Sequence, residues 1–556
     1  MVLIPFVLGC NDYLNINTDP NKPTTMSVGK LLPYAQISVA YSVAPGARGN
    51  EYSGIGDLLN VYGHQITVRE DADKYASSGS NWTIGTSWRN AYVDALTNLE
   101  DIIKQGTEDG NLQYAGISKI LKVYLYSVLV DVYGSVPYHE AISEYYPHFD
   151  KGDEIYADLF VVLEEAISNL TDTVAPNALA PGVDDLIYGG DNTRWVNAAN
   201  TLKLKMLNQI RLTRDVGADI QALLDSDDLI GGFDESLLFK FSSSTSPDNR
   251  NPAYSDTYEA SQKTKYISPW FYEILMGYNA TIFAGNKDPR IPYYFYNQIK
   301  PDASIASPAE YRDGGFVSIY FGSDGPDRDH SQDNAMTIVG IYPAGGLYDD
   351  GNAVKVSGRP NASTGAAPFR MITYADRLFI EAELIQTGTI SGDAKSKLKS
   401  AIEAAFAQVD GVVALVGNGQ TVPKIASSSE TATYIDNVIA EFEAAGADKK
   451  LEIILTQKWI SDFGNGLELY NDYRRTGYPV LFDPNNAQMA PNGYAKPKSE
   501  NGGDPDRETG ESPAVKVSCS RGFPLSLPWP NDELEPNVNA PAQKTNLPEY
   551  TVFWDK

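Results

Sequence analysis

The residue types that most often carry out catalysis are sparse in this chain, and they form no recognised catalytic spacing. None of the four histidines (His64, His139, His148 and His330) lies in an H-E-x-x-H pair or beside a C-x-x-C motif. A G-x-S-x-G elbow, a P-loop and a dinucleotide-binding fingerprint are also missing. We therefore expect no catalytic residues. A surface glycoside hydrolase stays an alternative, because two carboxyl groups can be brought together from distant positions in the chain.

One acidic stretch has the residue types of a metal site. It reads SDGPDRDHSQDN and contains Asp324, Asp327, Asp329, Asp333 and Asn334. Oxygen ligands at short spacing suit calcium, although this spacing does not fit an EF-hand loop. A solvated acidic loop without a metal is the alternative interpretation, and the favoured one.

Aromatic side chains are the most prominent chemical feature, with 35 tyrosines, 19 phenylalanines and 7 tryptophans. Flat ring faces stack on the C–H faces of sugar rings, and tyrosine adds a hydroxyl group. Since binding residues lie preferentially on loops, we expect a ligand platform there rather than on the apolar stripes of helices. Most of the rings will nevertheless belong to the core.

Trp82 is the first candidate for such a platform, because a Ser- and Gly-rich stretch places it in a loop just before a helix. Tyr75 lies in the same stretch, and Asn81 offers an amide for hydrogen bonds to sugar hydroxyls. Trp88, in contrast, shares the apolar stripe of the following helix and is expected in the core. Further candidates follow in a loop-rich region: Trp270, Tyr272, Tyr293, Tyr294, Tyr296, Tyr311 and Phe316. For each of these rings, packing within its own loop is the alternative.

The first ten residues (MVLIPFVLGC) predict a secretory leader that ends in a lipobox, with lipidation at Cys10. A buried N-terminal strand is the alternative. Residues 11–26 are polar and read as a flexible tether. No later apolar run reaches the roughly 18 residues that a membrane span needs. We therefore expect a protein that is anchored to a membrane without crossing it.

The composition of the chain limits the classes of molecule that we expect it to bind. The net charge of −28 repels phosphate backbones and anionic headgroups, which argues against nucleic acid and modestly favours a neutral ligand. Besides Cys10 the chain has one cysteine, Cys519, so no disulfide framework is expected.

Apolar periodicity predicts a mostly α-helical chain. Helices are expected at residues 27–43, 86–105, 112–133, 153–170, 193–214, 372–386, 392–409, 431–445, 449–463 and 467–475. Short breaks between them favour antiparallel pairs that resemble divergent tetratricopeptide-type repeats. Residues 216–369 are rich in Gly, Pro and Asp and predict an irregular insertion. Residues 481–556 are rich in Pro and Asn.

Several segments together resemble the SusD/RagB family of outer-membrane lipoproteins. The segments are residues 15–21 (NINTDPN), 131–138 (DVYGSVPY), 149–156 (FDKGDEIY), 194–200 (RWVNAAN), 457–460 (QKWI), 471–479 (NDYRRTGYP), 524–530 (PLSLPWP) and 535–537 (EPN). Leu527 stands where the family usually has Arg. Most of these residues also have a mechanical interpretation: Gly134 ends a helix, Asp153 caps one, and Trp195 and Trp459 lie in the core.

The resemblance implies a single SusD-like domain over residues 27–556, with a helical scaffold at about 27–215 and 370–480. The irregular half would carry the ligand. It also implies an outward-facing lipoprotein of the outer membrane that binds a neutral oligosaccharide or polysaccharide, without a cofactor, and passes it to a SusC-like TonB-dependent transporter. A peptide-capturing lid of the same family and a scaffold without a ligand are the alternatives.

Overall fold

The structure, a computed structural model, describes residues 26–49, 52–356, 363–417, 419–483, 486, 489, 494–495 and 515–555. The predicted leader with Cys10 and nearly all of the predicted tether lie outside the described residues. Among the helices that are described, none combines the length and the apolar character needed to cross a bilayer.

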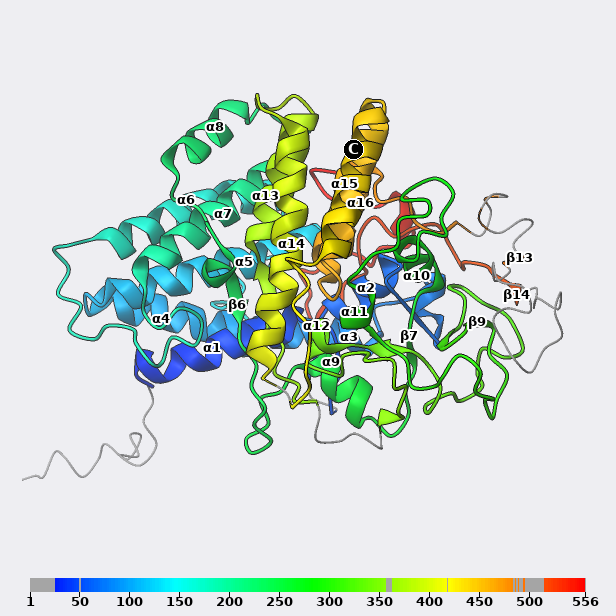
Figure 1. Cartoon of the computed structure of the whole chain (residues 1–556). Helices are drawn as coiled ribbons and strands as arrows, with labels where there is room; N and C mark the ends of the chain where they lie inside the picture. The colour runs from blue at the N-terminus through cyan, green and yellow to red at the C-terminus, as the bar shows by residue number, and fades with distance from the viewer. Residues whose placement is uncertain are drawn as a thin grey trace, which may run out of the picture.

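The fold is mostly α-helical, as predicted, with long helices on one side of the molecule and loops on the other (Figure 1). The long helices are α1 (Val28–Val43), α4 (Thr97–Glu108), α5 (Leu112–Tyr133), α6 (Gly152–Thr171), α7 (Asn192–Ile210), α13 (Tyr374–Gln386), α14 (Ala394–Val416), α15 (Ser429–Ala444), α16 (Ala447–Ser461) and α17 (Gly466–Thr476). Their bounds agree with the predicted ranges to within a few residues, with three exceptions: α7 ends earlier, α14 ends later, and α4 is only the second part of the helix predicted at residues 86–105.

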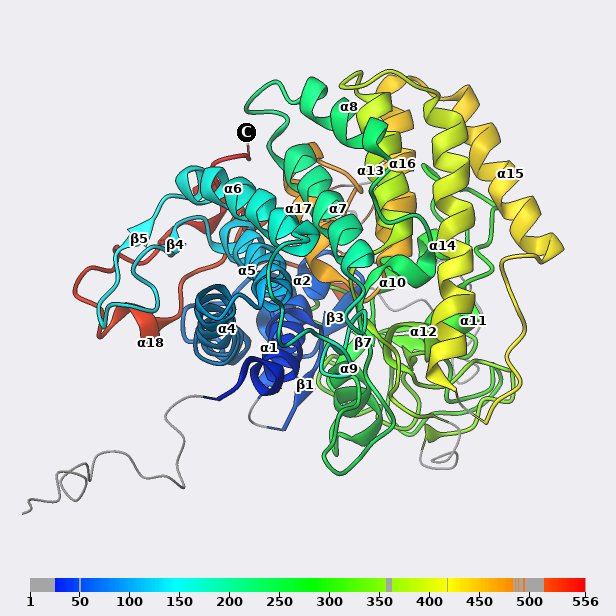
Figure 2. The ribbon, with the colours of Figure 1, turned by 90° about the vertical axis from the view of Figure 1, so that its left-hand side faces the viewer.

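Consecutive helices pack against each other as pairs: α4 with α5, α6 with α7, α13 with α14, and α15 with α16. The pairs also stack, because α5 contacts α6 and α7 contacts α13 (Figure 2). The apolar periodicity of the sequence predicts this arrangement, in which each helix pair buries its apolar face against the next pair.

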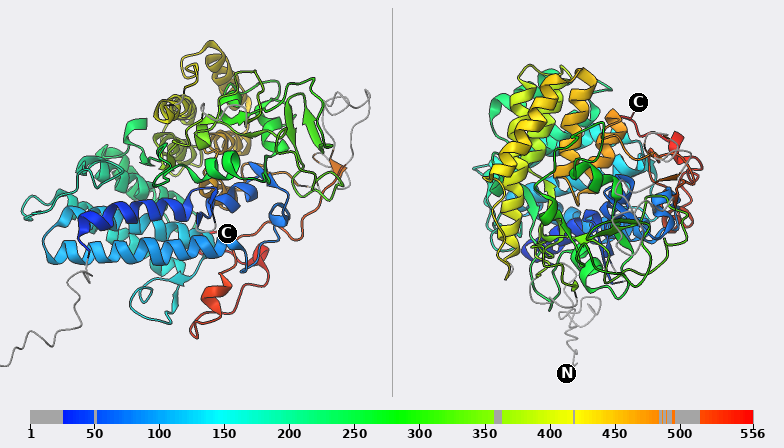
Figure 3. Two further views of the ribbon diagram at one scale, coloured as in Figure 1. Left: turned by 90° about the horizontal axis from the view of Figure 1, so that it is seen from below. Right: turned by 45° about the vertical axis from the view of Figure 1, so that its right-hand side comes forward.

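The loop-rich half is built from short elements joined by long connections (Figure 3). Its helices are α8 (Gly217–Ser226), α9 (Pro252–Tyr254), α10 (Pro269–Leu275), α11 (Ile291–Tyr294) and α12 (Ile341–Ala344). Its strands are β6 (Leu237–Phe239), β7 (Lys265–Ile267), β8 (Phe295–Tyr296), β9 (Tyr311–Asp313), β10 (Phe316–Ser318) and β11 (Ile338–Val339). These strands form two-stranded antiparallel sheets. In two of the sheets the partner strand lies outside this half: β7 pairs with β3 (Ile66–Val68), and β6 pairs with β12 (Phe369–Ile372).

Two helix starts differ from the prediction. Helix α3 (Trp82–Arg89) begins at Trp82 instead of residue 86, because the Asn81 side chain accepts a hydrogen bond from the Ile84 amide at 3.3 Å and caps the first turn. A π-helical stretch (Asn90–Leu96) then joins α3 to α4. Helix α6 begins at Gly152, so Asp153 lies in its first turn and does not cap it; a Cβ at position 152 would lie 2.8 Å from a methyl group of Val130.

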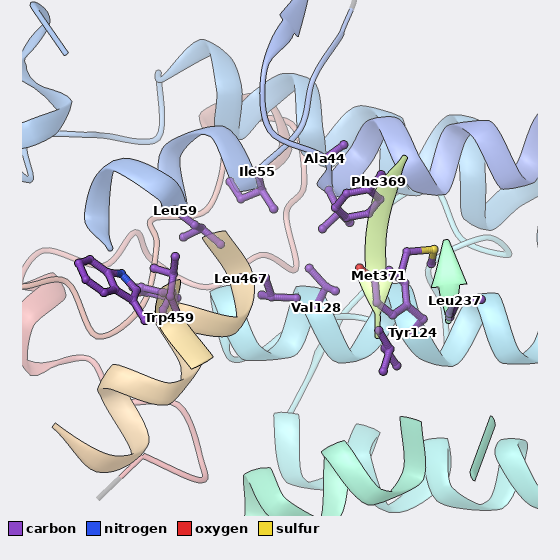
Figure 4. Packing of buried hydrophobic residues seen from close by; sticks show 14 of the residues in the cluster. Ala44, Ile55, Leu59, Tyr124, Val128, Leu237, Phe369, Met371, Trp459 and Leu467 are labelled. Carbon is purple, nitrogen blue, oxygen red and sulfur yellow. The ribbon is translucent and has the colours of Figure 1, made fainter. Parts of the chain in front are cut away.

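One large apolar cluster joins the two halves. Trp459 and Leu467 pack near Leu59, while Phe369 and Met371 of β12 lie along the same cluster (Figure 4). Trp88, Trp195 and Trp459 are buried, as predicted. The Trp459 indole donates to the Gly63 carbonyl at 2.9 Å. Residues almost 400 positions apart are therefore fixed to each other in the core.

The core also holds a set of charged side chains, here called the core ion cluster: Lys205, Arg211, Glu383, Lys458, Glu468, Asp472 and Arg475. Glu383 lies 2.9 Å from Arg211 and 2.8 Å from Arg475. Burial by itself would raise the pKa of Glu383, but the two guanidinium groups outweigh it and lower the pKa to about 2. The cluster ties α7, α13, α16 and α17 together.

The C-terminal segment closes the end of α5. The Lys544 amine donates to the carbonyls of Tyr133 at 2.6 Å and Leu527 at 2.7 Å, and it lies over the Trp529 ring. The Leu527 amide donates to the Val132 carbonyl at 2.9 Å. Last-turn carbonyls of a helix lack intrahelical partners, so these bonds satisfy groups that would otherwise be orphaned. Leu527, where the resemblance suggested Arg, is fully buried at this junction.

We predict that Glu383→Gln lowers the free energy of unfolding by about 3–5 kcal/mol, because it leaves buried guanidinium groups without their counter-charge. Urea unfolding followed by circular dichroism measures the change. Glu443→Gln is the matched control: it breaks the Glu443–Lys395 pair, which has the same kind of contact at 2.7 Å but is exposed. The control should leave stability unchanged, and equal effects of the two substitutions would contradict the prediction.

Candidate functional site

An open hollow of about 590 Å³ lies beside the first turn of α3, and we call it the Trp82 groove. The Trp82 side chain is 47% exposed within it. The other wall comes from the C-terminal segment around α18 (Asn531–Leu534). The polar lining residues are Ser80, Asn81, Thr86, Arg89, Asn531, Asp532, Glu533 and Glu535. An exposed ring flanked by hydroxyl, amide and carboxylate groups has the composition of a carbohydrate-binding surface.

The exposure of Trp82 follows from how α3 is held. Ile84 and Trp88 on the inner side of the helix are buried in the core. The preceding loop is pinned by the C-terminal segment, since the Asn531 amide donates to the Gly79 carbonyl at 3.0 Å. A Cβ at Gly79 would lie 2.3 Å from the Asn531 side chain, so only glycine allows this approach. The indole ring is thus displayed on a rigid support.

A second hollow of about 410 Å³ adjoins the Trp82 groove and shares Tyr92, Val93 and Glu533 with it. Tyr145 and Tyr146 line this hollow, and Tyr145 is 85% exposed. These tyrosines were not among the predicted site residues. Their position in a polar stretch between β4 (Val136–Pro137) and β5 (Phe149–Asp150) was the signal that could have identified them.

A separate cavity of about 400 Å³ lies at the start of α10, and we call it the Trp270 pocket. The Trp270 ring is half-buried, and its indole nitrogen donates to the Val480 carbonyl at 3.0 Å. The residues that line the pocket are Ser268, Pro269, Trp270, Glu273, Asn279, Ala280, Thr281, Tyr320, Phe321, Lys449, Glu452, Val480, Phe482, Asn486 and Met489. Of the predicted platform residues, only Trp270 lies here.

The structure revises the other predicted platform rings. Tyr75, Tyr272, Tyr293, Tyr294, Tyr296, Tyr311 and Phe316 are each at most 6% exposed, so their faces are covered by protein. The Tyr75 hydroxyl lies 2.6 Å from the His64 ring nitrogen, and the Tyr293 hydroxyl donates to the Pro423 carbonyl at 2.7 Å. Phe316 stacks on Tyr272 with ring centroids 3.7 Å apart.

The physical reason for this correction is that the loop-rich half has little regular structure with which to form a core. Six of the seven rings come from its short elements and fill its interior, and the hydroxyl groups of Tyr293, Tyr294 and Tyr296 donate to backbone carbonyls. The seventh ring, Tyr75, lies outside this half. These seven rings are therefore packed inside the protein, as the alternative interpretation of the sequence proposed.

The acidic stretch does not gather into a metal site. Asp324 is bound by Lys74 and the Ser518 hydroxyl, Asp327 lies 3.4 Å from His330, and Asp333 accepts the Lys263 amide at 3.0 Å. The Asp329 carbonyl accepts from Arg69. Within the described ranges, no group of three or more His, Cys, Asp or Glu side chains is placed to hold a metal ion. The carboxylates are used in separate contacts.

Comparison with known proteins places the chain among outer-membrane binding proteins. Residues 20–499 match the SusD-like family described as "Starch-binding associating with outer membrane". A protein named as chitin-binding has a similar structure, with a TM-score of 0.64, 20% identity, and coverage of 95% of this chain and 100% of its own. No curated protein matches the sequence.

Two further structures are similar along nearly their whole length. A SusD/RagB family protein from Bacteroides thetaiotaomicron has a TM-score of 0.66 at 21% identity, covering 95% of this chain and 99% of its own. A SusD homologue from Bacteroides fragilis has a TM-score of 0.65 at 16% identity, with the same coverage. Similarity at these identities establishes a shared fold.

A buried carboxyl group, Glu310, holds one wall of the Trp270 pocket. It accepts the Tyr320 amide at 3.2 Å and the Ser323 hydroxyl, and Tyr320 and Phe321 line the pocket. Burial raises the pKa of Glu310 to about 7, against smaller lowering effects of these hydrogen bonds and of Arg328. Asp327 nearby raises it further.

We predict that the folded protein loses stability between about pH 4.5 and pH 7 on account of Glu310. The folded state keeps this proton up to about pH 7, whereas the unfolded chain releases it near the ordinary glutamate pKa. The folded state thus binds more protons in that window, and stability falls as the pH rises, by at most about 3 kcal/mol. Glu310→Gln should remove this part of the pH dependence.

The measurement is urea unfolding of both proteins at pH 5 and pH 8. The stability of the variant relative to the parent should rise between these two values. If the difference between the two proteins stays constant, Glu310 does not bear the raised pKa.

Proposed function

The chain belongs to the SusD-like family of starch-binding proteins that associate with the outer membrane, and on this premise we propose that it captures a neutral polysaccharide at the cell surface. The Trp82 groove is the capture site. Trp82 is the stacking platform, and the amides of Asn81 and Asn531 are the hydrogen-bonding partners of sugar hydroxyls.

The exposed indole of Trp82 is the single observation on which this proposal rests. Single exposed rings are common on protein surfaces. Trp82 differs from them because it lies in a hollow with many polar lining residues, so a ligand bound in that hollow would cover the ring. Because α3 and the C-terminal segment fix the backbone that carries the ring, little backbone entropy is lost when a sugar stacks on it. The open shape of the groove and the adjoining hollow with Tyr145 suits a chain that continues beyond one sugar unit.

The charge of the groove supports a neutral ligand. Asp532, Glu533 and Glu535 face it, and Arg89 is the one basic side chain among its lining residues. An anionic glycan would be repelled by these carboxylates, whereas hydroxyl groups can donate hydrogen bonds to them.

The remaining parts of the proposal concern anchoring and delivery. Lipidation at Cys10 would hold the protein on the outer face of the outer membrane, and a SusC-like TonB-dependent transporter would receive the glycan. No catalytic step is required of this chain, since stacking and hydrogen bonding suffice for capture.

We predict that Trp82→Ala weakens polysaccharide binding at least tenfold, because burying an indole face is worth about 1.5–3 kcal/mol. The measurement is affinity electrophoresis of residues 11–556 in gels containing starch, a β-1,3-glucan, a soluble cellulose derivative or glycol chitin. The last polymer enters the panel because of the similar chitin-binding protein.

Tyr34→Ala is the control for this substitution, because Tyr34 is exposed to the same extent (46%) but does not line the groove. It should migrate like the parent protein in every gel. If the Trp82→Ala variant is retarded as strongly as the parent protein, the groove is not the capture site. If no polymer retards the parent protein, the ligand is not one of these glycans, and peptides are the next class of ligand to test.

A further inference from the structure

We propose that Asp462 keeps a proton at neutral pH and donates it to Asp376, so that two buried carboxyl groups form a pH-sensitive joint between α13 and α16. Asp462 is the C-cap of α16, and Asp376 lies in the first turn of α13. Both side chains are buried. Neither residue lines the Trp82 groove or the Trp270 pocket, so the proposal is independent of the proposed function.

Hydrogen bonds that do not involve the two carboxyl groups hold their chain segments side by side. Arg370, in the strand just before α13, donates through its guanidinium to the Phe463 carbonyl. The side-chain amide of Asn465 donates to the Arg370 carbonyl at 3.1 Å. Helices α13 and α16 also pack directly against each other. Because Phe463 follows Asp462 in the chain, these bonds fix the end of α16 against the start of α13.

Each carboxyl group has one buried oxygen that no donor within the described part of the chain satisfies: Oδ1 of Asp376 and Oδ2 of Asp462. Other unpartnered buried atoms occur in this protein, but these two belong to acidic side chains that are in hydrogen-bond contact with each other. Two acceptor oxygens repel each other unless a proton lies between them. One proton shared by the pair satisfies both oxygens.

The cap of α13 decides which of the two groups carries the negative charge. Asp376 Oδ2 accepts the Thr373 amide at 2.8 Å, and the Thr373 hydroxyl accepts the Asp376 amide at 3.1 Å, which together form a capping box. The positive end of the helix dipole also favours a carboxylate at this position. Asp462 lies at the opposite, negative end of α16, where a carboxylate is disfavoured. The proton therefore belongs to Asp462.

The surroundings of Asp462 favour its neutral form. Burial raises the pKa of Asp462 well above its ordinary value, and the Asp376 carboxylate raises it further. Lys458, one turn earlier in α16, acts in the opposite direction, but its amine is already paired with Asp472 at 2.8 Å. Glu468 of α17 adds to the raising effect on the pKa.

Three further titratable or charged side chains face the pair from other elements: Arg370 of β12, Tyr342 of α12 and Tyr124 of α5. Burial raises the pKa of both tyrosines, so both are uncharged at neutral pH. The Arg370 guanidinium lies over the Tyr342 ring and is bound to a backbone carbonyl. Its charge is therefore directed to other partners.

Sharing a proton makes the joint sensitive to pH in one direction. The folded protein keeps the Asp462 proton, whereas the unfolded chain releases it near the ordinary aspartate pKa of about 4. The folded state thus binds more protons above pH 4, and stability falls as the pH rises until Asp462 titrates. Beyond that pH, two carboxylates face each other across the contact between α13 and α16.

Asp462→Asn tests the proposal, because an amide of the same shape donates to Asp376 at every pH. We expect the folding equilibrium constant of the variant, divided by that of the parent, to rise about tenfold per pH unit above pH 4 until Asp462 titrates. Urea unfolding of residues 11–556 between pH 4.5 and pH 7.5 measures this ratio. A ratio that is independent of pH overturns the proposal.

Infrared difference spectroscopy at pH 7 locates the proton without reference to stability. The spectrum of the parent minus that of Asp462→Asn should contain the carbonyl stretch of a protonated carboxyl group. Asp376→Asn should lose the same band, because its amide would donate to Asp462 and leave that group ionised. Glu443→Gln, which alters an exposed carboxylate, is the control and should keep the band.

Two spectroscopic results contradict the shared proton. If the parent lacks the band that Asp462→Asn should remove, both carboxyl groups are ionised. If the band persists in Asp376→Asn, burial alone keeps the proton on Asp462, and the pairing with Asp376 is overturned.

Discussion

The core ion cluster is the interaction on which the rest of the structure depends. Charges taken out of water are costly unless their geometry is complementary, and here seven side chains from four helices compensate each other. Lys458 lies 2.8 Å from Asp472, and Arg475 binds both Asp472 and Glu383. Apart from the Asp472–Arg475 pair within α17, the ion pairs join different helices. The cluster therefore links α13, α16 and α17 to one another and, through α7, to the N-terminal helices.

This frame determines where the irregular parts of the chain lie. The start of α16 forms part of the Trp270 pocket, and the C-terminal segment that closes α5 continues into the wall of the Trp82 groove. Each candidate site therefore combines a rigid helix end with a loop segment. The tryptophan of each site stands in the first turn of a helix, α3 or α10, and loop segments supply other parts of the wall.

The abundance of tyrosine has two physical origins that composition cannot separate. In the loop-rich half, buried rings replace the regular backbone pairing that this half lacks, as when the Tyr294 hydroxyl donates to the Ile460 carbonyl at 3.0 Å. On the surface, Tyr145 and Trp82 keep their faces in solvent. The proposed glycan capture needs only a few rings of the second kind, and Trp82 and Tyr145 both lie at hollows.

The sequence by itself determined the helices, their pairing and the family. Apolar periodicity marks α5 and α13 because a helix that packs on its neighbour must repeat its apolar residues every turn. The motifs that contain Lys458 and Arg475 carry part of the family resemblance. Both side chains are buried charges of the core ion cluster, so these motifs report the fold. Tertiary structure alone decided which rings face solvent. Tyr75 and Trp82 lie in one loop region and look alike in sequence. The rings of Phe321 and Phe523, from distant parts of the chain, pack against Tyr75, whereas Trp82 stands at a capped helix start. Contacts between residues distant in sequence set exposure, and the local pattern of residue types does not encode them.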